Sequence, residues 1–121
     1  MAVLGLHHAH VLCPPSGEAE ARRFYIEQLG LRELPKPDSL RDQGGCWFEA
    51  PDGGQVHISP ERDLGLHPRR HFALRVDDVA TMRSALERNG VRSEEAVEIP
   101  GVRRCYVFDP FGNKIELHEI T

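Results

Sequence analysis

The sequence predicts an α+β protein built from two copies of one strand–helix–strand–strand–strand module. Turn-and-strand segments recur at 52–58 and 109–117, and in each a metal-type side chain, His57 or Glu116, follows a glycine-containing turn by the same step. Amphipathic helical segments that end in a glycine also recur, each preceded by a strand that carries a histidine. A repeat of this length that occurs only twice predicts paired modules about a pseudo-twofold axis rather than a solenoid.

The first module is expected at about residues 1–60. The Pro14-Pro15-Ser16-Gly17 run breaks its first strand, and early acids with apolar side chains at helical spacing predict the helix that follows. The expected elements, in order, are a strand at 4–13, a helix at 18–29, a short strand at 31–34, a loop at 36–45, a strand at 46–50, a hairpin turn at 51–54 and a strand at 55–59.

A linker at about 61–68, with breakers and mixed charge, is expected before the second module at about 69–121. There Asp77 or Asp78 is suited to cap a helix. The expected elements are a strand at 71–76, a helix at 79–89, a short strand at 91–93, a loop to 101, a strand at 103–108, and the final turn and strand at 109–117.

Composition narrows the function classes. The 121 residues make one domain's worth of chain, 40% hydrophobic and 28% charged, which is ordinary for a soluble globular protein. A formal charge of −4 without basic clusters argues against a nucleic-acid partner. No apolar run approaches a membrane span and no signal peptide is visible, so a cytoplasmic protein is expected. Three cysteines without CxxC spacing, Cys13, Cys46 and Cys105, predict reduced buried thiols.

Four of the predicted strands separate an aliphatic face from a polar one. The helices should cover the aliphatic faces, which carry Ala9 and Val11, Val56 and Ile58, Phe72 and Leu74, and Ile115 and Leu117. The opposite faces carry His8, His57, His71 and Glu116. Imidazole and carboxylate groups suit divalent Zn, Ni, Fe, Co or Mn. The competing interpretation is that these are solvated or structural side chains, as strand carboxylates and histidines often are.

Other side chains have a functional and a structural interpretation. His10 shares a face with His8 and either lines the same cleft as a catalytic group or is a hydrogen-bonded structural residue. Trp47 either lines the pocket or packs in the core. One of Arg103 and Arg104 should face the cleft by strand alternation, where it could hold an anionic substrate, although a solvated ion pair is the other possibility.

The chain resembles the vicinal oxygen chelate superfamily over essentially its whole length. This group includes glyoxalase I, fosfomycin-resistance thiol transferases, methylmalonyl-CoA epimerase, extradiol dioxygenases and bleomycin-resistance proteins. The motifs that carry the resemblance are Leu6-His7-His8-Ala9, Arg23-Phe24-Tyr25 with Leu29-Gly30-Leu31, His71-Phe72-Ala73-Leu74-Arg75-Val76-Asp77-Asp78, and Asp109-Pro110-Phe111-Gly112-Asn113-Lys114-Ile115-Glu116-Leu117.

The resemblance implies paired βαβββ modules whose curved mixed sheets form a U-shaped cleft around one divalent metal ion. His8, His71 and Glu116 match the ligand triad of the metal-dependent members. His57 stands where glyoxalase I has a Glu, which makes it the candidate fourth ligand. The resemblance also implies a homodimer, in which modules pair within one chain or are exchanged between two.

No well-known activity of the superfamily fits without a departure. Leu12 and Glu61 stand where bacterial glyoxalase I has an Arg and an Asn, which argues against a glutathione hemithioacetal as substrate. No Arg follows Glu116 to hold a phosphonate as in the fosfomycin enzymes. The chain is short for a two-domain extradiol dioxygenase, and it keeps the metal ligands that bleomycin-binding members lack.

The expected function is therefore a metal-dependent, glyoxalase-like lyase or isomerase for a small substrate with vicinal oxygens. The metal would stabilise an enediolate or oxyanion by Lewis-acid catalysis, with Glu116 or His57 moving the proton. The alternatives are a metal-free module that binds a small molecule or antibiotic, a ring-cleaving dioxygenase, and a thiol transferase.

Overall fold

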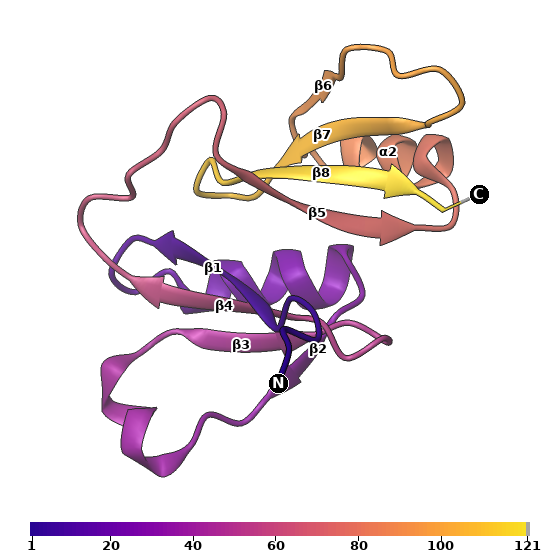
Figure 1. Cartoon of the computed structure of the whole chain (residues 1–121). Coiled ribbons are helices and arrows are strands. Elements are labelled where there is room, and N and C mark those ends of the chain that lie inside the picture. Colours follow the sequence, from indigo (N-terminus) through magenta and orange to yellow (C-terminus); the bar gives the residue numbers. More distant parts are fainter. Residues whose placement is uncertain (121) are drawn as a thin grey trace. The chain divides into compact units, whose positions relative to one another are not determined.

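Each half of the chain folds into one four-stranded mixed sheet with helical segments on one face, as the computed structural model shows for residues 1–120 (Figure 1). The two compact units are Met1–Leu64 and Gly65–Thr121. Strand order is β1-β4-β3-β2 in the first sheet, sheet A, and β5-β8-β7-β6 in the second, sheet B. The predicted α+β class and the two strand–helix–strand–strand–strand modules are confirmed, and neither sheet closes on itself.

The first unit follows the predicted element order with local differences. Its elements are β1 (His8–Cys13), α1 (Glu18–Arg22), the π-helix η1 (Arg23–Gln28), β2 (Arg32–Leu34), the 3₁₀-helix η2 (Asp38–Gln43), β3 (Cys46–Glu49) and β4 (Gln55–Pro60). The strand start expected at residue 4 is wrong. β1 begins at His8, opposite Gln55, because β4 offers no earlier residue to pair with, and Leu4 and Leu6 are exposed.

The second unit repeats the arrangement. Its elements are β5 (His71–Val76), α2 (Val79–Arg88), β6 (Ser93–Glu95), β7 (Arg104–Phe108) and β8 (Lys114–Glu119). Asp78 begins α2 by accepting a hydrogen bond from the Thr81 backbone amide at 3.0 Å, as an N-cap aspartate should. The last short strand before β7 lies two residues later than the sequence predicted. No helix of residues 1–120 is long and apolar enough to cross a membrane.

The aliphatic faces lie against the helical segments, as expected. Val56, Ile58, Ile115 and Leu117 are buried, and the Tyr25 ring of η1 stacks on Phe48 of β3 with centroids 5.3 Å apart. All three cysteines are buried, and none forms a disulfide bond within residues 1–120. Burial raises the pKa of the Cys46 thiol to about 11 and raises the pKa of Cys105 as well, so both are protonated at neutral pH.

The strand registers show which residues occupy equivalent positions in the two sheets. In sheet A, His57 lies between His10 of β1 and Trp47 of β3. In sheet B, Glu116 lies between Ala73 of β5 and Tyr106 of β7. Glu116 is therefore the counterpart of His57, and Tyr106 the counterpart of Trp47. Because neighbouring strand residues in register share a face, each sheet has one face that collects the polar side chains.

The turns before β4 and β8 have the same backbone. In the first, the Ala50 amide bonds to the Gly54 carbonyl at 2.8 Å; in the second, the Asp109 amide bonds to the Asn113 carbonyl at 3.0 Å. The central glycines, Gly53 and Gly112, have φ of 92° and 93°, a region that favours glycine. Each turn thus sets its strand so that the fourth residue after the glycine reaches the polar face.

Candidate metal-binding half-sites

In the first unit, His57 is the centre of a column of aromatic rings. Its ring stacks on Trp47 with centroids 4.0 Å apart and on His8 at the same separation, with interplanar angles of 4° and 14°. Its Nε2 lies 2.8 Å from Oε1 of Gln55, so the imidazole N–H donates to the amide oxygen. The side chain is only 5% exposed, and its position is fixed by stacking and by one hydrogen bond.

These surroundings keep His57 neutral. Burial, followed by the neighbouring imidazoles of His8, His10 and His7, lowers the pKa of His57 to about 4. Burial and His8 also lower the pKa of His10, whose Nε2 lies 2.7 Å from the Ser59 hydroxyl. Neutral imidazole is the form that ligates metal ions, so the lowered pKa values of His57 and His10 favour the form with a nitrogen lone pair.

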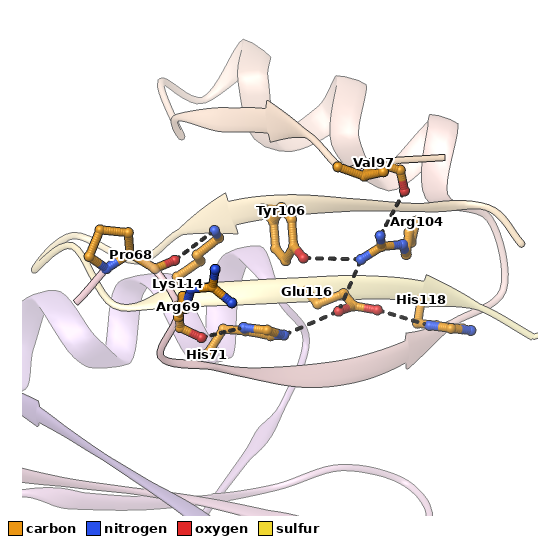
Figure 2. Close-up of polar contacts among 9 residues, drawn as sticks. All are labelled: Pro68, Arg69, His71, Val97, Arg104, Tyr106, Lys114, Glu116 and His118. Atoms are coloured by element: carbon orange, nitrogen blue, oxygen red, sulfur yellow. Dashed lines mark hydrogen bonds and ion pairs between the residues drawn. The ribbon is translucent and has the colours of Figure 1, made fainter. Parts of the chain in front are cut away.

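In the second unit, Glu116 is surrounded by groups that favour its ionised form (Figure 2). One carboxylate oxygen, Oε1, lies 3.3 Å from His71 Nε2 and 3.6 Å from Arg104 Nη1, and the other accepts a hydrogen bond from His118 Nδ1 at 3.0 Å. Burial raises the pKa of Glu116. The His118 hydrogen bond and the charges of Arg104 and His71 together outweigh it and hold that pKa below its ordinary value.

The turn before β8 is pinned by its own side chains. Asp109 Oδ1 accepts hydrogen bonds from the Phe111 and Asn113 amides, both at 2.9 Å, and Oδ2 accepts one from the Asn113 side-chain amide at 2.8 Å. Asp109 and Asn113 are buried. The start of β8 is therefore fixed independently of the groups that surround Glu116.

The His71 ring is oriented by the backbone. Its Nδ1 lies 3.0 Å from the Arg69 carbonyl oxygen, which can only accept, so Nδ1 carries a proton (Figure 2). In the neutral ring, Nε2 then holds a lone pair that faces Glu116 Oε1. Two acceptors at this distance need a proton or a cation between them. A backbone carbonyl that fixes the other ring nitrogen is also the usual support of a metal-ligating histidine.

The predicted ligands therefore come together as two pairs, one in each unit: His8 with His57, and His71 with Glu116. Each pair is called a half-site below. Among residues 1–120, no three or more His, Cys, Asp or Glu side chains gather closely enough to hold a metal ion. The chemistry of the donors nevertheless fits a divalent ion, because the half-sites present imidazole nitrogens and a carboxylate oxygen.

Three of the other predicted site residues lie on the polar faces that carry His57 and Glu116, and one does not. Half-buried Trp47 and hydrogen-bonded His10 lie on the polar face with His57. Arg104 is on the face of Glu116, whereas Arg103 is exposed and lies 4.0 Å from Glu119. A substrate role for Arg103 thus remains a prediction without a contact to either half-site.

Sequence reasoning missed three neighbours of Glu116. Tyr106 lies directly opposite it on β7, and Lys114 and His118 flank it on β8. The signal was available in the alternation of β8, which puts Lys114, Glu116 and His118 on one face. Tyr106 required the register of β7 against β8, which depends on the length of the final turn.

The profile of the Glyoxalase/Bleomycin resistance protein/Dioxygenase superfamily matches residues 7–117. The chain belongs to this superfamily. A glyoxalase family protein from Bacillus anthracis has a solved structure similar to this chain, with 36% identity and a TM-score of 0.91 over 100% of this chain and 98% of that one.

Two further relatives differ in what they are named for. "Glyoxylase I 4" of Arabidopsis thaliana is 26% identical over 93% of this chain and 68% of its own length. The structure of TnmS3, an antibiotic binding protein from Streptomyces sp. CB03234, is 25% identical with a TM-score of 0.72, over 100% of this chain and 99% of that one. Membership in the superfamily therefore leaves both a catalytic and a binding function open.

Proposed function

We propose that the chain is a divalent-metal-dependent lyase or isomerase that acts on a small substrate with two vicinal oxygens. The ligands would be His8 and His57 from the first half-site and His71 and Glu116 from the second, supplied by one chain or by two exchanged copies. The bound metal would supply Lewis-acid stabilisation of negative charge that develops on the substrate oxygens.

The observation that carries the proposal is the His71–Glu116 pair. The Arg69 carbonyl accepts from Nδ1 of His71, so Nε2 is the ring nitrogen that faces a carboxylate oxygen 3.3 Å away, and a metal ion between these two atoms would have a nitrogen and an oxygen ligand. His57 adds a second nitrogen donor that is unprotonated at neutral pH because its pKa is lowered to about 4. Both Glu116 and His57 are thus in the form that accepts a proton from a substrate carbon.

Elemental analysis of the natively purified protein tests the proposal directly. We expect about one Zn, Ni, Fe, Co or Mn ion for each set of four ligands. The double variant His8→Ala/Glu116→Ala should lose the metal. The matched double variant His67→Ala/Glu98→Ala removes the same two residue types from exposed positions and should keep it. Full metal stoichiometry in the first variant would refute the ligand assignment, and a native protein that neither contains nor binds these ions would refute the function.

Once metal is found, a substrate screen divides the enzyme classes. Methylglyoxal with several thiols tests a glyoxalase reaction, catechols with Fe(II) test ring cleavage, and fosfomycin with thiols tests transfer to an epoxide. We expect turnover only in the metal-loaded protein, and restoration of metal after chelation should restore the rate.

A metal-free binding function is the second candidate. The parallel rings of Trp47, His57 and His8 provide a stacking surface for a flat aromatic molecule, and the relative TnmS3 is named as an antibiotic binding protein. Fluorescence titration of the chelator-treated protein with aromatic antibiotics tests this function through Trp47. Quenching that persists without metal, in a protein that is inactive in the screen above, would favour binding over catalysis.

A further inference from the structure

The polar face of sheet B carries more positive than negative charge, although the whole chain has a formal charge of −4. Three permanent cations stand at polar-face positions: Arg104 and Lys114 on the inner strands β7 and β8, and Arg75 on the edge strand β5. Glu116 is the carboxylate among them, and it already has three partners. Glu94 lies opposite Tyr106 on the edge strand β6, where it is paired with Arg92 at 3.8 Å.

Tyr106 is the point where two of these cations meet. Lys114 Nζ lies 4.0 Å from the centroid of the Tyr106 ring and donates one hydrogen bond to the Pro68 carbonyl at 2.9 Å (Figure 2). From the other side, Arg104 Nη1 donates to the Tyr106 hydroxyl oxygen at 3.0 Å. The lysine is thus held over the face of the ring, while the arginine is bonded to its tip.

These contacts leave donors unused. The Tyr106 oxygen accepts from Arg104, so its own O–H is available to donate to a second group. The Lys114 ammonium has three N–H groups, of which the Pro68 carbonyl accepts one. Arg104 Nε is buried without a hydrogen-bond partner in residues 1–120, and the carboxylate nearest this guanidinium is shared with His71 and His118.

We propose that the substrate carries an anionic group, a carboxylate or a phosphonate, in addition to its vicinal oxygens, and that this group binds beside Tyr106, between Lys114 and Arg104. The inference rests on the proposed metal-dependent function. A divalent ion on Glu116 would consume the one carboxylate of the inner strands and add positive charge beside Arg104 and Lys114. A neutral substrate would leave that charge uncompensated, whereas an anion receives charge-assisted hydrogen bonds from the unused donors.

Sheet A explains why the anionic group belongs to sheet B. Its polar-face positions on β1, β3 and β4 hold imidazoles, Trp47, Gln55, Ser59 and Leu12, with no permanent cation. Its one carboxylate there, Glu49, forms an ion pair with Arg32 of β2. An anion would gain little on that face, because the polar-face positions of these three strands offer it no permanently charged donor.

Three small chelators, one neutral and two that carry an added anionic group, test the inference. Acetohydroxamate offers two vicinal oxygens alone. Succinate monohydroxamate and phosphonoacetohydroxamate add a carboxylate or a phosphonate. Calorimetric titration of the Zn²⁺-loaded protein should show the anionic compounds binding about tenfold more tightly than acetohydroxamate. The preference should weaken as salt is added.

Two variants place the anionic group. Lys114→Gln should reduce the preference to about twofold or less, and Tyr106→Phe, which keeps the ring and removes the O–H, should reduce it several-fold. Arg88→Gln is the matched control, because it removes one positive charge from the exposed end of α2 on the other side of the same sheet and should leave the preference unchanged. Thermal melts of all three variants confirm folding.

The outcomes separate the two proposals. Equal binding of neutral and anionic hydroxamates would overturn the anionic-substrate inference and leave the metal site standing. Loss of all hydroxamate binding in a folded protein that cannot be loaded with metal would overturn the proposed function itself. An anionic preference that survives both Lys114→Gln and Tyr106→Phe would overturn the placement beside Tyr106.

Discussion

The two units share a backbone plan but hold their central polar residue by different forces. In sheet A, His57 is fixed between two rings, is buried and stays neutral. In sheet B, Glu116 occupies the equivalent position, is ionised, and is fixed by an arginine and two imidazoles. The repeated turn and register thus supply a position on the polar face, and the neighbouring side chains determine whether that position bears charge.

One backbone difference accounts for part of this contrast. Gly45 precedes β3 at the position that Arg104 occupies in sheet B, when the register of β3 with β4 is extended by one residue. A Cβ on Gly45 would lie 2.0 Å from the Ile58 carbonyl oxygen. Sheet A therefore has no room for a side chain where sheet B places its guanidinium.

The largest expected effect comes from Gly45→Ala. It should lower the free energy of unfolding by about 3 kcal/mol or more, since a backbone clash is added to the cost of a φ of 86°. Urea denaturation measures the loss. Gly30→Ala is the matched control, because Gly30 has a φ of 79° and open space around its Cβ, and it should cost only about 1 kcal/mol. Similar losses of stability in the two variants would mean that the close approach of the Ile58 carbonyl oxygen to Gly45 adds nothing to the cost of the positive φ.

The next effect is a pH dependence that differs between the units. The pKa of His57 is about 4 in the folded chain and about 6.5 when unfolded, so the unfolded state binds a proton first as the pH falls. Stability should drop by up to about 3 kcal/mol between about pH 6.5 and about pH 4, with His10 adding to the trend. The Glu116 contribution has the opposite origin. Its pKa is lower in the folded chain than in the unfolded chain, so ionised Glu116 stabilises the fold at higher pH. This stabilisation is lost only as the pH falls below about 4.5.

Urea unfolding at stepped pH in the presence of a chelator separates these windows. His57→Phe keeps the stacked ring, removes the titrating group, and should flatten the curve above about pH 4.5. Glu116→Gln should leave that part of the curve as it is. An unchanged slope in His57→Phe would show that another group carries the acid sensitivity.

The smallest effect compares the two turns. Gly53→Ala and Gly112→Ala should each cost about 1 kcal/mol, because both glycines have nearly the same positive φ. A Cβ at Gly53 meets nothing, and one at Gly112 meets only the end of the Leu66 side chain at 2.9 Å, which can move aside. Parallel denaturation curves should differ by only a few tenths of a kcal/mol. A much larger loss of stability in Gly112→Ala would show that the Leu66 side chain cannot move aside and that the two turns are not equivalent.

Local patterns in the sequence predicted most of this fold. Alternation gave the faces of β4, β5 and β8, and the glycines marked the ends of both helical segments. The π-helical turn at 23–28 could not be predicted, because its apolar spacing also suits an α-helix. The start of β1 depended on where the partner strand begins, which is a non-local fact.

The candidate site also has features that local sequence patterns predicted and features that depend on non-local contacts. The polar-face positions of His57 and Glu116 followed from the repeated turn, and their pairing with His8 and His71 followed from the facing of the strands. The stacking of His57 on Trp47 and the bond from Arg104 to the Val97 carbonyl depend on side-chain conformation and on the path of the 96–103 loop. No periodicity in one sequence encodes those contacts.

The reactivity of the buried thiols can report local opening of each unit. Cys46 and Cys105 occupy equivalent register positions, one in each sheet, and their raised pKa values keep them protonated and unreactive while their unit is folded. Alkylation can therefore proceed only when a unit opens. With Cys13 and Cys46 in the first unit and Cys105 in the second, peptide-resolved alkylation rates would record how often each unit opens, without any label being introduced.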